Sequence, residues 1–180
     1  MKNLIIFTVL TISASTAFGQ NDYFWKNKLG NRIPETESRR SVENFGGSLL
    51  VTSDTDWKEK WDTPSETVPN FNEAKIIPRG KKVFVLIFFA NAKLSNYGNA
   101  NVSCDLEMVS PDGTKSLNQH NAVCYQGKIL GNPNNMYLSA PVIAFVREPS
   151  DPTGVWTVRV ALKDKLRKVT VPLKTSFTLK

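Results

Sequence analysis

The residues near the C-terminus alternate between apolar and polar side chains over eleven positions, and this period of two is the strongest structural signal in the chain. Val169, Val171 and Leu173 alternate with polar positions, and the pattern runs on to Leu179. Because successive side chains of a strand point to opposite faces, the alternation predicts a β-strand with one buried face. Pro172 falls on the polar face, which predicts an edge position, since proline cannot donate a ladder hydrogen bond.

Seven further segments have the composition of short strands and are separated by turn residues. One of them, residues 81–90, is apolar on both faces, which predicts a central strand covered on each side. One short helix is predicted near residues 54–62, where Trp57 and Trp61 lie four positions apart and therefore on one face. The other predicted strands cover residues 45–52, 71–77, 102–108, 119–125, 136–146 and 156–162. Together these elements predict an all-β, antiparallel sandwich of about seven to nine strands.

Residues 1–19 have the three parts of a secretory signal peptide. A positive residue precedes an apolar run over residues 4–12, and the small residues Ala17 and Gly19 occupy the positions that a signal peptidase reads. The apolar run is too short to cross a bilayer as a permanent helix. We therefore expect cleavage before Gln20, a periplasmic or secreted location, and no transmembrane segment in the mature chain.

The mature chain has the length of one ordinary domain. Residues 20–41 are polar and mixed in charge, and we expect them to form an N-terminal arm before a single β-sandwich domain over residues 42–180. The arm carries three adjacent aromatic residues, Tyr23, Phe24 and Trp25. Two interpretations stay open. Either these rings fold back and fill a groove on the domain, or they anchor a partner, because aromatic residues are enriched at interface hot spots.

The two cysteines, Cys104 and Cys124, lie on either side of the turn sequence at residues 110–113. Antiparallel strands that leave this turn bring the two side chains together, and an oxidising compartment favours a disulfide. We expect a structural disulfide rather than a redox site, because the sequence has no Cys-x-x-Cys pair and neither cysteine has a basic neighbour to lower its pKa.

The C-terminal part resembles a known family. Residues 151–160 contain the pattern G-x-W-x-V-x-V, which begins at Gly154 and is followed by a hairpin and the alternating residues 174–179. This is similar to the closing hairpin of bacterial immunoglobulin-like domains. The resemblance implies an immunoglobulin-like sandwich and no particular activity, because that family includes adhesins, chaperones and inhibitors. The cysteines depart from the intersheet pair of antibody-type domains, since we expect them on neighbouring strands of one hairpin.

No catalytic, cofactor or metal-binding motif stands out in the sequence, so we expect a non-enzymatic protein without a cofactor. His120 is the only histidine and lies among polar residues, which is typical of a hairpin surface. Asp105 and Glu107 point to the same side of a predicted strand, but solvated carboxylates are commoner there than a glycosidase acid–base pair. One histidine and two oxidised cysteines cannot supply the three or four ligands of a zinc site.

The chain is basic, with a formal net charge of +7. Outside the cytoplasm a basic surface meets acidic proteins, anionic lipid head groups and acidic glycans rather than nucleic acid. The loops at residues 91–101 and 127–135 are long and polar, as recognition loops are. The candidate partner-binding residues are the aromatic residues of the arm (Tyr23, Phe24, Trp25) and the basic turn before the last strand (Lys163, Lys165, Arg167, Lys168).

The leading hypothesis is a secreted or periplasmic module that binds another protein, with an acidic surface on that partner. It would act as an inhibitor or immunity protein against a toxin or hydrolase, or as an accessory envelope subunit. The alternative is a carbohydrate- or envelope-glycan-binding module, in which Trp57, Trp61 or the aromatic arm stacks on sugar rings. Core packing also explains a Trp pair at this spacing.

Overall fold

The computed structural model describes residues 24–27, 29–64, 69–78 and 80–180. The predicted signal peptide at residues 1–19 and the candidate binding residue Tyr23 lie outside these ranges. The elements, in chain order, are β1 (Arg39–Val42), β2 (Phe45–Thr52), α1 (Trp57–Trp61), β3 (Ile76–Ile77), β4 (Lys82–Ala90), β5 (Asn99–Val109), β6 (Lys115–Lys128), β7 (Met136–Leu138), β8 (Ile143–Val146), β9 (Gly154–Asp164) and β10 (Val169–Leu179). No helix among the described residues is long and apolar enough to span a membrane.

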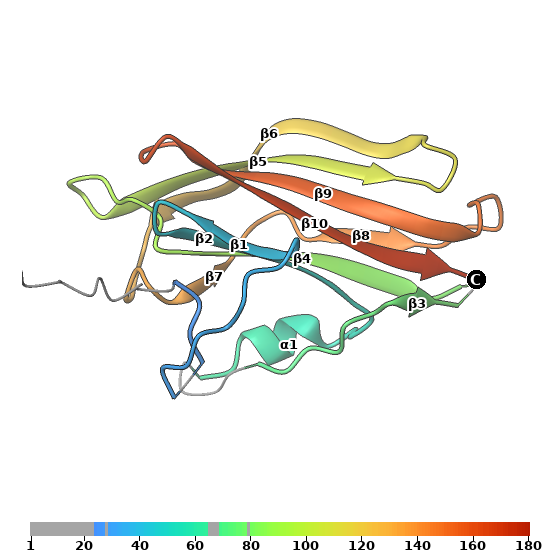
Figure 1. The fold of residues 1–180 in the computed structure, drawn as a ribbon, viewed down its shortest axis with the longest axis horizontal. Coiled ribbons are helices and arrows are strands. Elements are labelled where there is room, and N and C mark those ends of the chain that lie inside the picture. The colour runs from blue at the N-terminus through green and yellow to red at the C-terminus, as the bar shows by residue number, and fades with distance from the viewer. Residues whose placement is uncertain (1–23, 28, 65–68, 79) are drawn as a thin grey trace, which may run out of the picture.

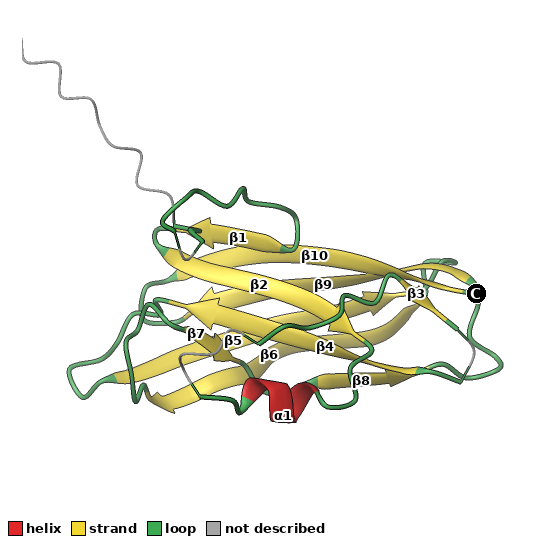
Figure 2. Cartoon of the chain, turned by 90° about the horizontal axis from the view of Figure 1, so that it is seen from below, coloured by secondary structure: helices red, strands yellow, loops and turns green. Residues whose placement is uncertain are grey.

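The strands form two sheets that pack face to face, so the predicted β-sandwich is confirmed (Figures 1 and 2). The first sheet has the order β1-β2-β4-β7, and β8 lies alongside the other half of β4. The second sheet has the order β3-β10-β9-β5-β6. All pairs are antiparallel except β3 with β10. The described residues thus form ten strands, slightly more than predicted. The polar strand β1 was not among the predicted strands, and the predicted strand at residues 136–146 is divided into β7 and β8.

Two of the sequence predictions about strand position are confirmed. β4 lies inside the first sheet, between β2 on one side and β7 and β8 on the other. β10 is an edge strand at Pro172, because β3 pairs with it only at Thr178 and Leu179. The immunoglobulin-like relationship stays a prediction, although β9 and β10 do pair as a closing hairpin over their whole length.

β4 is apolar on both faces because each face is covered by a different layer. Its inward residues, among them Val85 and Phe89, belong to the core between the two sheets. Its outward residues lie under α1, where the Trp57 ring is 5.8 Å from the Phe84 ring, centroid to centroid. In the same way, Trp61 lies 5.2 Å from Phe88. Both indoles therefore pack on the outer face of the sheet, as four-residue helical spacing allows.

The predicted disulfide between Cys104 and Cys124 is present, and it joins β5 to β6 within one hairpin. The two Cα atoms are 5.8 Å apart, and both side chains are fully buried. The turn at residues 110–113 connects the strands, as its sequence indicates. The disulfide therefore reinforces a strand pair at the free edge of the second sheet.

The first strand starts within the segment that we expected to form the arm. β1 opens at Arg39 and pairs with β2 from Arg39 opposite Ser48 to Val42 opposite Phe45. Residues 39–41 therefore belong to the sheet rather than to the arm. β1 has the polar sequence Arg-Arg-Ser-Val, which carries no strand signal of its own.

Candidate functional site

Three loops predicted from separate parts of the sequence come together at one end of the sandwich, on the left in Figure 1. They are residues 91–98, 129–135 and 165–168, and we call them the loop end. The Ile129 N–H donates to the Gly98 carbonyl at 3.1 Å, and the Asn91 N–H donates to the Pro133 carbonyl at 2.7 Å. The Lys165 N–H donates to the Asn101 carbonyl at 2.9 Å. Backbone hydrogen bonds thus join the loops at residues 91–98 and 129–135 to each other, and the loop at 165–168 to β5.

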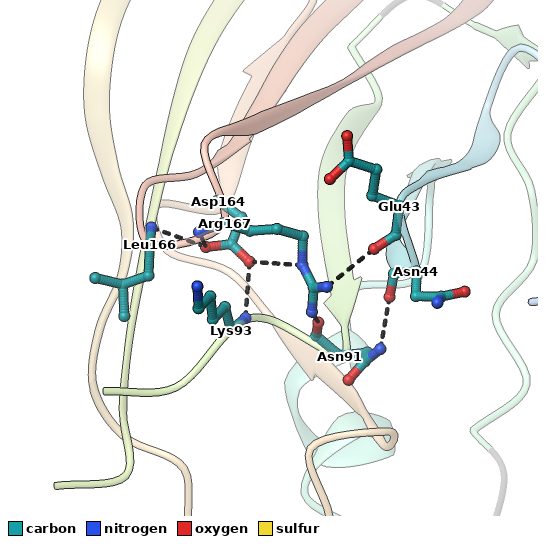
Figure 3. A network of polar contacts seen from close by, with 7 residues as sticks. All are labelled: Glu43, Asn44, Asn91, Lys93, Asp164, Leu166 and Arg167. Atoms are coloured by element: carbon teal, nitrogen blue, oxygen red, sulfur yellow. Dashed lines mark hydrogen bonds and ion pairs between the residues drawn. The ribbon is translucent and has the colours of Figure 1, made fainter. Parts of the chain in front are cut away.

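Asp164 is the centre of a polar network beneath these loops (Figure 3). It ends β9 and is 1% exposed. Its carboxylate accepts the N–H of Lys93 at 2.7 Å and the N–H groups of Leu166 and Arg167 at 3.0 Å each. A buried carboxylate requires such donors, because burying an unpaired charge is costly. Asp164 therefore fixes the loop after β4 against the β9–β10 hairpin.

Arg167 extends this network to the β1–β2 turn rather than pointing freely into solvent. Its guanidinium donates to the Glu43 carbonyl at 3.0 Å and to the Asn91 carbonyl at 2.9 Å, and it forms an ion pair with Asp164. The Asn91 side chain in turn donates to the Asn44 carbonyl at 2.7 Å (Figure 3). Of the candidate binding residues, Arg167 is thus the one that holds the loops in place.

Four lysines give the loop end its charge: Lys93, Lys128, Lys165 and Lys168. All four are exposed, and none of them takes part in an ion pair found among the described residues. Lys163 differs, because its ammonium lies 2.6 Å from the Asp105 carboxylate. The three loops contain no Asp or Glu. The four lysines are therefore not neutralised by any acidic residue of these loops.

Two large apolar side chains project from the same loops. Tyr97 is 84% exposed and Leu130 is 88% exposed. They come from adjacent loops, because the hydrogen bond from Ile129 to Gly98 joins the residues next to them. Exposed apolar side chains surrounded by charges are typical of interfaces, whose centres are apolar and whose rims are polar.

The aromatic arm packs against the domain where the structure describes it. The Phe24 ring packs against Gly46 of β2. A Cβ atom added at Gly46 would lie 2.1 Å from this ring. Trp25 is 9% exposed, stacks edge-on with Phe24 at 4.9 Å between centroids, and lies under the guanidinium of Arg39 at 6.0 Å. Of the two interpretations, the structure favours a folded-back arm for Phe24 and Trp25.

The residues considered for catalysis are paired or exposed. His120 lies exposed on β6. Hydrogen bonds from Lys163 and from the Asn121 backbone lower the pKa of Asp105, and hydrogen bonds from Lys115 and Arg159 lower the pKa of Glu107. A general acid needs a raised pKa, so neither carboxylate fits that role. No group of three or more His, Cys, Asp or Glu side chains among the described residues could hold a metal ion.

Comparisons with protein-family models and with curated proteins return no match. Among solved structures, a family 123 glycoside hydrolase from Clostridium perfringens is similar over 74% of this chain, with a TM-score of 0.43 and 10% identity. This chain spans only 27% of that hydrolase. A Niemann-Pick type C2 protein from the Japanese carpenter ant has a TM-score of 0.40 and 14% identity over 74% of this chain and 89% of its own. A FixG-related protein from Vibrio parahaemolyticus has a TM-score of 0.37 and 10% identity, over 77% and 99%. These similarities assign no family.

Proposed function

We propose that the protein is an exported, non-catalytic module that binds an acidic surface of another protein through its loop end. The observation that carries this proposal is the combination of four exposed lysines, which form no ion pair with any described residue, with the projecting side chains of Tyr97 and Leu130. Lysines steer an acidic partner toward the loops, and complementary charge raises the association rate more than the affinity. The apolar side chains then supply the buried contact.

The network beneath the loops supports this role because it reduces the cost of binding. A surface whose loops are already held in one arrangement loses less conformational freedom when a partner binds. Asp164 and Arg167 together bond to two of the three loops, residues 91–98 and 165–168, and to the β1–β2 turn. An inhibitor or immunity protein, or an accessory envelope subunit, would use such a rigid surface.

The alternative of a glycan-binding platform on the helix has weaker support. Trp57 and Trp61 both face β4, where they stack on Phe84 and Phe88. Rings in such contacts serve as packing for the outer face of the sheet. An exported location remains part of the proposal. It rests on the predicted signal peptide and on the disulfide, which forms readily outside the cytoplasm.

A pair of matched charge variants tests the proposal. The test variant replaces the loop-end lysines with glutamine: Lys93, Lys128, Lys165 and Lys168. The control variant removes the same charge from exposed lysines around β3, the start of β4 and the C-terminus, at the opposite end in Figure 1: Lys75, Lys81, Lys82 and Lys180. The chain from Gln20 onward is immobilised, an extract of the producing cells is passed over it, and retained proteins are identified by mass spectrometry.

We expect one acidic protein to be retained by the wild type and by the control variant. The loop-end variant should associate with it at least about tenfold more slowly at low salt. A partner held equally by both variants would place the interface elsewhere. Retention of anionic phospholipid vesicles, without any protein, would replace the protein partner with a membrane surface.

A further inference from the structure

A groove of about 730 Å³ crosses the outer face of the first sheet, and the proposed protein interface does not use it. Figure 2 looks onto this face, with α1 in front of the strands. Leu50 and Phe88 come from β2 and β4, while Trp61 and Phe71 come from α1 and the segment after it. The volume lies within the ~300–1,000 Å³ that is usual for small-molecule sites. Its apolar lining suits a hydrocarbon ligand.

Arg39 of β1 lines one end of the same groove. Its Nη2 donates to the Pro34 carbonyl at 3.0 Å, but its Nε is buried without any hydrogen-bond partner. No ion pair found among the described residues includes Arg39. A guanidinium carries five donors whose arrangement matches a carboxylate. This end of the groove could therefore bind an anionic group.

The acidic residue of the groove lining is Glu73, and it does not serve as that anion. The Glu73 side chain is 51% exposed, and its carboxylate lies 3.5 Å from the Lys75 ammonium. Glu73 would therefore repel an anionic ligand only weakly, because Lys75 offsets its charge and water screens an exposed carboxylate.

The floor of the groove favours a ligand without amide groups. Ser48 of β2 sits in register between Arg39 of β1 and Phe88 of β4, and Phe88 is opposite Leu138 of β7. The backbone groups of these inner strands are therefore occupied by the sheet. A peptide laid on the floor would bury N–H and C=O groups that the sheet backbone cannot pair, which costs free energy. A hydrocarbon chain has no such groups.

We propose that this groove binds a single-chain amphiphile with a terminal carboxylate, such as a free fatty acid. The hydrocarbon chain lies along Leu50, Phe88 and Trp61, and the carboxylate accepts hydrogen bonds from Arg39. Because Arg39 lines the groove, a carboxylate at this end would give its guanidinium the anionic partner that no ion pair among the described residues supplies. The ligand class follows from the juxtaposition of a largely apolar lining and a guanidinium that has no ion-pair partner among the described residues.

The test compares decanoate with 1-decanol, which has the same chain length and no charge. Both are titrated at neutral pH into the chain from Gln20 onward, below their aggregation limits, and binding is followed by calorimetry. Arg39→Gln should weaken decanoate binding at least about tenfold, because a charge-assisted hydrogen bond is lost, and change decanol binding less than about twofold. Arg40→Gln removes a neighbouring exposed charge that does not line the groove, so it should leave both unchanged. Trp61→Ala should weaken both ligands.

Three results would overturn the proposal. The first is that the wild type binds neither ligand at about millimolar concentration. The second is that Arg39→Gln weakens both ligands equally, which would mean that Arg39 only supports the arm. The third is that an apolar peptide with a free C-terminal carboxylate binds while decanoate does not, which would make the groove a peptide site. Thermal unfolding of each variant confirms that it is folded.

Discussion

Asp164 Oδ2 lies 3.5 Å from Arg167 Nε, and this ion pair joins two of the three loops of the loop end to the β1–β2 turn. The two residues are only three positions apart, yet their other partners come from distant parts of the chain. Lys93 donates to Asp164, and Arg167 donates to the carbonyl of Glu43. The pair therefore links the first and last hairpins of the described domain.

Asp164→Asn is expected to lower the free energy of unfolding by about 2–4 kcal/mol, because hydrogen bonds to a charged acceptor are lost and Arg167 is left without its counter-ion. Urea denaturation followed by far-ultraviolet circular dichroism measures the change. Asp62→Asn is the control, since Asp62 is exposed and its one ion-pair partner among the described residues is Lys58, and it should change stability by less than about 0.5 kcal/mol. Equal losses in both variants would contradict the role of Asp164.

Asp54 gives the fold a predictable dependence on pH. Burial alone would raise the pKa of Asp54, but hydrogen bonds from Lys60 and Asn72 outweigh it and lower the pKa from 3.8 to about 2. Lys60 Nζ lies 2.9 Å from the carboxylate, and the Asn72 backbone N–H donates to it at 2.9 Å. Because the pKa in the folded state is the lower one, the stabilisation is complete above about pH 5 and is lost as the pH falls to about 2.

The lowered pKa of Asp54 corresponds to about 2 kcal/mol of stability. As the pH is lowered from about 5 to about 2, the free energy of unfolding of Asp54→Asn should therefore fall by about 2 kcal/mol less than that of the wild type. This difference does not depend on how stable the variant is at neutral pH. Urea denaturation at several pH values gives both curves. Parallel curves for the two proteins would show that Asp54 does not titrate as described. Asp62→Asn again serves as the control and should follow the wild type.

Removal of the disulfide should destabilise the protein without changing its fold. The double variant Cys104→Ala/Cys124→Ala opens a loop with a sequence separation of 20, which is expected to cost about 3 kcal/mol through loop-closure entropy. Chemical denaturation measures the loss. In the native wild type, both sulfurs are buried, so alkylation under native reducing conditions should be slow. Rapid modification of both cysteines, with no loss of stability, would contradict this expectation.

Gly46 and Phe24 should be energetically coupled, because only a glycine leaves room for the ring. Gly46→Ala should displace the arm and speed up its cleavage by trypsin, since the added Cβ would lie 2.1 Å from the Phe24 ring. In a Phe24→Ala background the same substitution meets no ring and should have a smaller effect on stability. A double-mutant cycle measures the difference, expected to be about 0.5–3 kcal/mol. Additive effects would mean that the arm does not rest on β2.

Several structural features followed from local sequence patterns. The period of two identified β10, and the apolar run at residues 81–90 identified a strand covered on both faces. The spacing of Cys104 and Cys124 around a turn placed the disulfide correctly. These predictions succeeded because each depends on neighbours within one strand or one hairpin.

Other features could not be predicted, because they depend on contacts between segments that are far apart in the sequence. Residues 71–77 have strand-like composition, but only β3 at its end is a strand, because Phe71 instead packs on Phe88 at 6.0 Å between centroids. The basic turn before β10 suggested four equivalent binding residues. Arg167 is turned inward, Lys163 is paired with Asp105, and Lys165 and Lys168 are exposed.

Local alternation of side chains determined that this chain forms a sandwich of short strands, with a disulfide across one hairpin. The tertiary structure alone decided which loops meet, which lysines stay exposed, and that Arg39 borders an apolar groove. The physical reason is distance along the chain. Arg167 and Glu43 are separated by 124 positions, and contacts of that range depend on how the two sheets pack rather than on any pattern within a segment.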